Sequence, residues 1–249
     1  MALTVHQFPC LSDNYGFLVR DEATGKVATI DTPDADAILA ELETLGWSLD
    51  LILNTHWHPD HAGGNEAIKK ATGATIAGPA EVTRIAPLDR VVRGGDVVLL
   101  GETRFEVIDS GGHTLGHIAY HDAEDAIAFV GDTLFALGCG RLFEGTPEQM
   151  WDSLTRITDL PDATTVYCAH EYTASNARFA LSVDSDPALK ARSEAIFAAR
   201  ERGEPTVPTT IAAEKATNPF LRAPLLRPDA PTPAQAFAEI RAAKDSFKG

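Results

Sequence analysis

Residues 55–61 read T-H-W-H-P-D-H, and this stretch decides the fold and the chemistry of the chain. Alternate residues of an extended segment point the same way, so the imidazoles of His56 and His58 can reach one metal ion. Asp60 and His61 open the next segment after a proline, and Asp60 can face a second ion. Imidazole nitrogens suit zinc and iron, while carboxylates add hard oxygen ligands. The stretch therefore predicts one part of a metal centre.

Three further candidate ligands, His113, Asp132 and His170, lie far along the chain. Each of them stands just beyond a β-rich run, on a loop that a sheet would anchor, which is where α/β proteins place their sites. The complete candidate set has seven members: His56, His58, Asp60, His61, His113, Asp132 and His170. Seven such ligands can hold two divalent ions, which generate hydroxide near neutral pH and stabilise an oxyanion.

The surrounding pattern indicates an α/β protein. Strands are predicted where β-rich runs are bounded by turn residues, at 3–8, 15–20, 27–31, 49–54, 74–77, 97–100, 105–108, 117–120, 126–130 and 165–169. Apolar residues at helical spacing predict helices over 34–45 and 65–72. A polar turn over 121–125 is expected to join two of the strands, which places His121 in a hairpin turn.

The pattern changes to helix after residue 146. Thr146-Pro147-Glu148-Gln149 combines an N-cap threonine, a proline in the first turn and a capping-box glutamine, so it predicts a helix as far as Leu160. Only helical patterns remain beyond His170, over 173–183, 187–202 and 233–247. The proline-rich stretches 203–208 and 218–233 are expected to be irregular.

The composition limits the partners of the chain. Its 249 residues carry 21 Lys and Arg against 36 Asp and Glu, and the net charge of −15 argues against nucleic acid or an anionic membrane as the main partner. No apolar run approaches the ~18 residues of a membrane span, and a secretory signal is not expected at the start. Three scattered cysteines are too few for a disulfide framework, so the cytoplasm is the expected compartment.

Four residues near the candidate ligands have roles other than metal binding. Asp31 and Asp109 stand at strand ends, where either carboxylate could orient a ligand histidine. Cys139 and Cys168 lie close to ligand segments, but the metal set is complete without thiolates. Both cysteines are therefore expected to be small buried hydrophobic residues.

The chain resembles the metallo-β-lactamase superfamily and, more narrowly, the glyoxalase II (hydroxyacylglutathione hydrolase) family. The motifs of the superfamily are THWHPDH at 55–61, GGHTLGH at 111–117, GDTLF at 131–135 and AHEYT at 169–173. The narrower match rests on GCGRLFEGT at 138–146, NPFLR at 218–222 and RAAKD at 241–245. The resemblance implies an αββα sandwich with a C-terminal helical domain. Its catalytic domain would cover 1–170, and its helical substrate-binding domain would cover 171–249.

The same resemblance divides the seven ligands between two ions. It implies that His56, His58 and His113 bind the first ion, that Asp60, His61 and His170 bind the second, and that Asp132 bridges them. Zinc is the expected metal, and iron and manganese are alternatives because these ligands suit all three metals comparably.

The glutathione-binding positions of the family fall on Arg141, Phe143, Tyr172, Arg241 and Lys244. A form of the family has lysine and tyrosine at the first two places. Arg141 keeps the positive charge, whereas Phe143 lacks the hydroxyl, so one hydrogen bond of roughly 0.5–1.5 kcal/mol is missing there. Arg241 and Lys244 are three residues apart on a predicted helix and share one face, from which both can reach one anionic group.

The implied reaction is hydrolysis of S-D-lactoylglutathione to D-lactate and glutathione, the second step of methylglyoxal detoxification. In our hypothesis Asp60 and Asp132 act in catalysis, hydroxide attacks the thioester carbonyl, and the thiolate leaves without a protonating residue. The expected partner is a small glutathione thioester, and the expected state is a monomer. Two other functions stay open at this point. One is a different chemistry of the superfamily, such as lactam hydrolysis, nucleic-acid processing or sulfur oxygenation, and the other is a non-catalytic protein that senses metal or a thiol conjugate.

Overall fold

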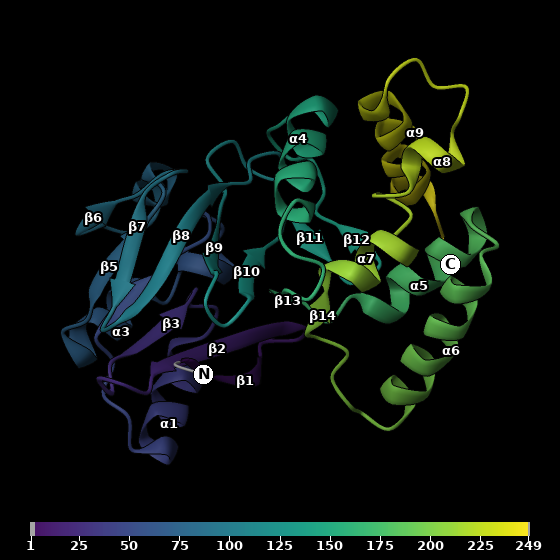
Figure 1. The fold of residues 1–249 in the computed structure, drawn as a ribbon. Helices are drawn as coiled ribbons and strands as arrows, with labels where there is room; N and C mark the ends of the chain where they lie inside the picture. Colours follow the sequence, from purple (N-terminus) through teal and green to yellow (C-terminus); the bar gives the residue numbers. More distant parts are fainter. Residues whose placement is uncertain (1–2, 249) are drawn as a thin grey trace. The chain divides into compact units, whose positions relative to one another are not determined.

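The computed structural model describes residues 3–248, which form two compact units (Figure 1). Unit 1 contains residues 3–109 and 116–131, and unit 2 contains residues 110–115 and 132–248. The chain therefore crosses from unit 1 into unit 2, returns, and crosses again before it enters its helical part.

Unit 1 is built on β-sheet. Its first sheet has the strand order β1-β2-β3-β4-β5-β6. The strands are β1 Leu3–Cys10, β2 Asn14–Asp21, β3 Val27–Ile30, β4 Leu51–Leu53, β5 Thr75–Gly78 and β6 Arg90–Val91. Strands β1 to β3 are antiparallel, whereas β3 to β6 are parallel. A further run of antiparallel strands has the order β10-β9-β8-β7. These are β7 Val97–Leu100, β8 Thr103–Asp109, β9 Ile118–Asp122 and β10 Ile127–Gly131.

Three α-helices and one 3₁₀ helix accompany the first sheet: α1 Ala35–Leu45, α2 Pro59–Ala62, α3 Asn65–Thr72 and η1 Ala80–Arg84. The carboxylate of Asp34 caps α1 by accepting hydrogen bonds from the backbone N–H groups of residues 36 and 37. Gly46 ends this helix with φ of 65°, a conformation that glycine adopts without strain. Ile38 of α1 and Ile68 of α3 pack with Ile52 of β4 in one apolar core. The predicted helices at 34–45 and 65–72 are thus confirmed.

Unit 2 is mostly helical. A short hairpin joins β11 Leu134–Phe135 to β12 Gly138–Cys139, and β13 Thr165–Cys168 pairs with β14 Thr209–Thr210. The helices are α4 Pro147–Thr158, α5 Thr173–Val183, α6 Pro187–Glu201, α7 Ile211–Thr217, α8 Ala223–Leu226 and α9 Pro233–Ser246. Figure 1 shows α5 and α6 running beside each other, and α9 packs against both α4 and α8.

A buried polar network holds the hairpin of unit 2. The Glu214 carboxylate of α7 is fully buried, pairs with Arg192 of α6 and accepts a hydrogen bond from the Leu137 backbone N–H. It also accepts a hydrogen bond from the Asn218 side chain, whose Nδ2 donates in addition to the carbonyls of Phe135 and Gly138. Because buried polar groups need partners, this network fixes the backbone of the segment that leads to Arg141.

Several features of the fold differ from the sequence prediction, which did not include α2, η1 or the short strands β6, β11, β12 and β14. His121 lies in β9 and is buried, so its placement in a hairpin turn was wrong. The strand continues to Asp122, and the turn is completed by Ala126 at a φ of 53°. Helices α7 and α8 were not predicted, because one follows a proline-rich stretch and the other lies inside one.

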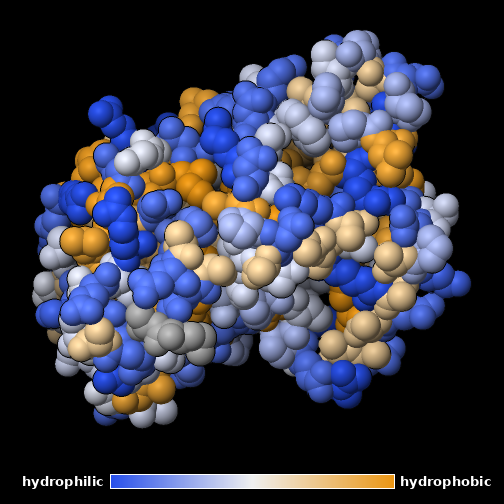
Figure 2. Space-filling model, viewed as in Figure 1, coloured by the Kyte–Doolittle hydropathy of each residue, from blue (hydrophilic) through white to orange (hydrophobic). Residues whose placement is uncertain are grey.

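Hydrophilic residues cover much of the visible face, and hydrophobic residues gather in patches between them (Figure 2). Within residues 3–248, no helix combines the length and the apolar character that crossing a membrane requires.

Candidate active site

The first four candidate ligands lie directly after β4, in unit 1. His56 follows the strand by three residues, His58 precedes α2, and Asp60 and His61 belong to α2. The Nε2 atom of His56 is 3.0 Å from the Nδ1 atom of His58. Two nitrogens bound to one tetrahedral zinc at about 2.0–2.1 Å would lie roughly 3.3 Å apart. The two imidazoles are therefore placed to share one ion.

Asp31 fixes the tautomers of two of these histidines through hydrogen bonds. Its carboxylate accepts hydrogen bonds from the Thr55 backbone N–H at 2.7 Å, from Thr55 Oγ1 at 2.8 Å and from His61 Nδ1 at 2.8 Å. His61 thus carries its proton on Nδ1, which leaves the lone pair on Nε2. The Thr55 hydroxyl donates to Asp31, so it accepts from His56 Nδ1 at 3.1 Å, and His56 also presents an Nε2 lone pair. Asp31 thus orients His61 and, through Thr55, His56, whereas for Asp109, which accepts the Gly94 backbone N–H, the orienting role stays a prediction.

Asp60 lies beside His61 and is held by a residue of β2. The Asp60 Oδ2 atom is 3.5 Å from His61 Nε2. Asn14 donates from Nδ2 to the same carboxylate oxygen at 3.2 Å. Asn14 was not singled out in the sequence, because an asparagine at the start of a strand gives no signal of its own. Unit 1 thus supplies three imidazoles and one carboxylate within a short segment, a set that fits a divalent ion.

Unit 2 supplies the other three candidate ligands. The carboxylate of Asp132 lies between two imidazoles, with Oδ2 at 3.3 Å from His113 Nε2 and Oδ1 at 3.3 Å from His170 Nε2. His113 Nδ1 is 2.9 Å from the carbonyl oxygen of Arg141, and a carbonyl only accepts, so His113 also keeps its lone pair on Nε2. A carboxylate with each oxygen facing a different imidazole has the arrangement expected of a bridging ligand.

Gly140 allows the backbone to approach this group closely. A Cβ atom at this position would lie 2.0 Å from the Asp132 carbonyl oxygen and 3.1 Å from His113 Nδ1. Any other residue would push the Asp132 backbone and the His113 ring away from their positions. The close approach of Asp132 and His113 therefore explains why the second glycine of the G-C-G-R motif, Gly140, has no side chain.

A cavity of about 490 Å³ opens beside these ligands in unit 2. Its walls are formed by His113, Asp132, Phe135, Cys139, Gly140, Arg141, Phe143, Tyr172, Ser175, Asn176, Arg241 and Lys244. All five residues that the sequence assigned to glutathione binding are among them. The Tyr172 ring stacks on His170 with centroids 4.6 Å apart, and the Phe143 ring stands edge-on to His113 at 5.2 Å. One cavity thus combines metal-type donors, aromatic faces and three cationic side chains.

The cations of the cavity differ in their environment. Arg241 is almost completely buried, whereas Arg141 is exposed. Burial lowers the pKa of Lys244 to about 8, and the positive charges of Arg241 and Arg141 act in the same direction, while Asp245 opposes them. An anionic group that enters this cavity therefore meets a concentration of positive charge in an otherwise acidic chain.

The two cysteines near the candidate ligands are protonated thiols. Cys139 and Cys168 are buried, and burial raises the pKa of their thiols to about 11 and about 12. A thiol with such a pKa stays protonated and is a poor metal ligand at neutral pH. The prediction that both are small buried hydrophobic residues is confirmed.

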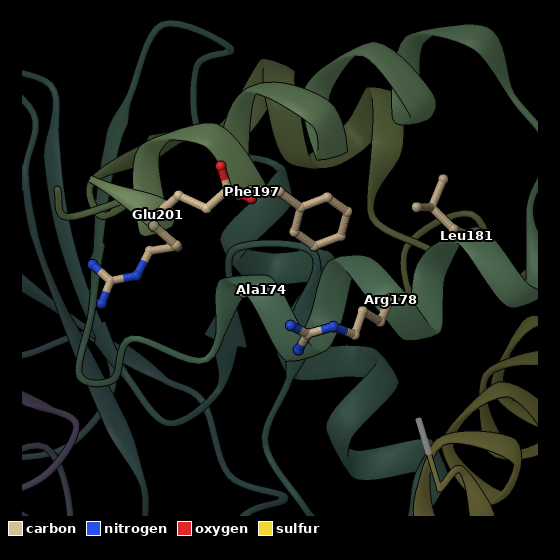
Figure 3. A pocket seen from close by; sticks show the side chains of 6 residues that line it. Ala174, Arg178, Leu181, Phe197 and Glu201 are labelled. Atoms are coloured by element: carbon tan, nitrogen blue, oxygen red, sulfur yellow. The ribbon is translucent and has the colours of Figure 1, made fainter. Parts of the chain in front are cut away.

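A second hollow of about 630 Å³ lies between α5 and α6 (Figure 3). It is lined by Ala174, Arg178, Leu181, Phe197, Arg200 and Glu201. Figure 3 shows Arg178 beside the ring of Phe197, and the guanidinium carbon is 5.7 Å from the ring centroid. Within the described residues its lining contains no histidine or aspartate, so the smaller cavity is the candidate active site.

Sequence comparisons relate the chain to known proteins over its whole length. Residues 17–170 match the family model of the metallo-beta-lactamase superfamily, and residues 171–247 match that of the hydroxyacylglutathione hydrolase C-terminus. The "Hydroxyacylglutathione hydrolase" of Erythrobacter litoralis is 57% identical over 98% of this chain and 100% of its own length. The protein of the same name from Maricaulis maris is 56% identical over 98% of this chain and 99% of its own.

Solved structures agree with the fold predicted from the sequence. ETHE1 from Myxococcus xanthus superposes with a TM-score of 0.66 at 28% identity, over 97% of this chain and 98% of its own. TTHA1623, solved in a di-iron-bound form, gives a TM-score of 0.64 at 26% identity, over 88% of this chain and 100% of its own. The metallo-β-lactamase fold with a C-terminal helical region is thereby confirmed. The two family models meet at residues 170 and 171, but the domain boundary stays a prediction.

Proposed function

Because the chain belongs to the hydroxyacylglutathione hydrolase family of the metallo-beta-lactamase superfamily, it is a thioester hydrolase, and we propose that it cleaves S-D-lactoylglutathione to D-lactate and glutathione. The observation that carries the choice of substrate is the cavity of unit 2. Its walls contain the candidate metal ligands Asp132 and His113 together with three cationic side chains, those of Arg141, Arg241 and Lys244. A glutathione thioester has a reactive carbonyl near its middle and carboxylates at its ends, so it needs both features.

We propose that the seven candidate ligands bind two divalent ions. His56, His58 and His113 would hold one ion, Asp60, His61 and His170 the other, and Asp132 would bridge them. Two observations support this assignment. Hydrogen bonds to Nδ1 leave the Nε2 lone pairs of His56, His61 and His113 available for a metal. The two carboxylate oxygens of Asp132 face different imidazoles, those of His113 and His170. Two divalent ions, when bound, lower the pKa of water and stabilise the oxyanion of the attacked carbonyl. Zinc is the proposed metal, and iron or manganese are alternatives because these ligands suit all three metals comparably.

The protein's own residues then position the substrate. Arg141, Arg241 and Lys244 attract the glutathione carboxylates, and Arg241 also donates to the Cys139 carbonyl beside the cavity wall. Tyr172 and Phe143 present ring faces and edges to the body of the peptide. The leaving group is a thiolate, which needs no protonation to depart, so the proposed mechanism assigns no proton donor. Asp60, held by Asn14, would orient the attacking water.

Steady-state hydrolysis tests this function. The metal-loaded protein should cleave S-D-lactoylglutathione with a kcat/KM far above that for a small neutral thioester, because only the former uses the cationic wall. A β-lactam substrate should be cleaved slowly or not at all. Binding of glutathione without any turnover would support the alternative of a sensor protein and overturn the proposal.

The physiological setting follows from the same assignment. We propose that the chain acts in the cytoplasm as a monomer, in the second step of methylglyoxal detoxification. Support comes from its three cysteines, which are buried and free of disulfide bonds. Such thiols suit a reducing compartment.

Glutathione affinity is expected to fall at alkaline pH. Lys244 must be protonated to attract a carboxylate, and the pKa of its amine in the free protein is about 8. Below pH 8 the cation is present and binding is strong, and as pH rises through 8 the charge and part of the affinity are lost. Calorimetric titration with glutathione between pH 6.5 and 9.5 should show this decline, and Lys244→Met should bind weakly with a flatter profile. A wild-type affinity that stays constant across this range would contradict the role of Lys244.

Restoring the hydroxyl at position 143 should strengthen substrate binding. Phe143 lines the cavity, and 62% of its surface is exposed, so the tyrosine of Phe143→Tyr has room for its hydroxyl. One new hydrogen bond of roughly 0.5–1.5 kcal/mol corresponds to a KM about 2–10 times lower for S-D-lactoylglutathione. The matched variant Phe197→Tyr, which lies in the other hollow, should leave KM unchanged. An unaltered or higher KM in Phe143→Tyr would remove position 143 from the glutathione contacts.

A further inference from the structure

The guanidinium of Arg241 is held on several sides. Its Nε and Nη2 atoms donate to the same oxygen of Asp245, at 3.1 and 2.7 Å, and its Nη1 donates to the Cys139 carbonyl at 3.1 Å. The guanidinium carbon also lies 5.0 Å from the centre of the Phe220 ring. Only 6% of the Arg241 side chain is exposed, whereas 50% of Asp245 is exposed. The orientation of this arginine therefore depends on a neighbour that itself faces solvent.

Arg241 links helix α9 to the hairpin that carries another cation. Cys139 is the last residue of β12 and precedes Arg141 by two positions. The hydrogen bond from Arg241 to the Cys139 carbonyl thus fixes the backbone from which Arg141 extends into the cavity. A displacement of the Arg241 guanidinium would therefore move the part of the cavity wall that carries Arg141 and Arg241.

Lys244 lies on the same helix and depends on the same charges. Its Nζ donates to the backbone carbonyl of Ser175 in α5 at 3.2 Å and lies 5.3 Å from the centre of the Phe179 ring. The charged and titratable groups that act on it are Arg241 and Asp245 in α9, Cys139 in β12, and Arg141 after β12. The arginines lower the pKa of Lys244, and Asp245 raises it.

We propose that Asp245 is a positioning residue for glutathione binding, which holds the Arg241 guanidinium and thereby keeps Arg141, Arg241 and Lys244 arranged to receive the carboxylates of the thiol conjugate. This inference rests on the proposed function. Asp245 itself does not line the cavity. Its effect passes through Arg241, and through the negative charge that it places between two cations of α9.

The test is the Asp245→Asn variant of the full chain in its metal-loaded form. The amide can still accept a hydrogen bond, but it carries no charge and makes a weaker contact with the guanidinium. Calorimetric titration should give a glutathione Kd about tenfold higher than in the wild type, and KM for S-D-lactoylglutathione should rise in parallel while kcat changes less than about twofold. The pH at which glutathione affinity declines should also move below that of the wild type, because Lys244 loses the carboxylate that raises its pKa. A residue that only stabilises the fold would not shift this pH.

Two further variants complete the design. Glu239→Gln removes another carboxylate of α9, which pairs with Arg227 at 3.5 Å, and should leave Kd and the pH profile unchanged. Asp245→Glu keeps the charge but lengthens the side chain, so it should retain the wild-type pH profile with a Kd raised severalfold. This variant also carries the test if Asp245→Asn unfolds.

Three results would overturn the positioning role. They are a wild-type Kd in both Asp245 variants, an unshifted pH profile in Asp245→Asn, or a loss confined to kcat. Because binding of glutathione is measured without turnover, failure of this inference is separable from failure of the proposed function. A wild-type protein that cleaves the thioester alongside an Asp245→Asn variant that binds normally would remove only the role of Asp245.

Discussion

Replacing Asp132 with alanine is expected to lower kcat/KM for S-D-lactoylglutathione by about three orders of magnitude, equivalent to ~4 kcal/mol of transition-state stabilisation. The two oxygens of this carboxylate each face a different imidazole at 3.3 Å. The variant therefore loses the carboxylate that lies between His113 and His170. We expect metal content to fall as well, because a bridging ligand is shared by both ions. The measurement is steady-state turnover with metal analysis of the same sample.

A matched control keeps this result interpretable. Asp159→Ala removes an exposed aspartate at the C-cap of α4 that is not a candidate ligand, and it should leave turnover and metal content unchanged. Near-normal turnover by Asp132→Ala with both ions still bound would refute the bridging role. Loss of turnover together with loss of both ions would support the shared-ligand assignment.

Reversing the charge of Arg241 is expected to act on substrate binding rather than on chemistry. In Arg241→Glu the new carboxylate would lie beside Asp245 and would repel the anionic substrate. A charge-assisted hydrogen bond contributes about 1.5–3 kcal/mol, so KM for S-D-lactoylglutathione should rise roughly 10–100-fold. KM for a small neutral thioester should change far less, because that substrate has no carboxylate to place.

The neutral variant Arg241→Gln separates charge repulsion from loss of contact, and it should show a smaller rise in KM. Arg202→Gln removes an exposed arginine that pairs with Glu204, and it serves as the surface control. Equal effects of Arg241→Glu on the anionic and the neutral substrate would contradict the assignment of this residue to the glutathione site.

Much of the fold was predictable because its signals are local. The helices α1, α3, α4, α5, α6 and α9 repeat apolar residues at helical spacing, and those with proline in the first turn begin at the predicted residue. Helices α7 and α8 were not predicted because both are short and they lie after or inside proline-rich stretches. Ile211 is buried only because α7 packs within unit 2, and no pattern of its own reveals this. The prediction for His121 was wrong because the polar run at 121–125 has the composition of a turn, whereas tertiary packing extends β9 as far as Asp122.

The candidate site was predictable to the extent that its residues have a chemical signature. Histidines and aspartates at the ends of β-runs indicate metal ligands, and an acidic residue at the end of β3 indicated the role of Asp31. Ser175 and Asn176 also line the cavity, but the sequence does not single them out, because serine and asparagine occur in many helices that have no role in a binding site. Asp245 was visible in the R-A-A-K-D motif, but its contact with Arg241 follows from the helical turn and the buried position of the guanidinium.

Titration of the metal-depleted protein tests the central claim most directly. Zinc is added in steps, and the number of ions bound per chain is measured together with the rate of S-D-lactoylglutathione hydrolysis. We predict that two ions bind per chain and that hydrolysis is absent without metal and reaches its maximum as the sites fill. Full hydrolysis in the metal-free protein, or two bound ions without hydrolysis, would contradict the account.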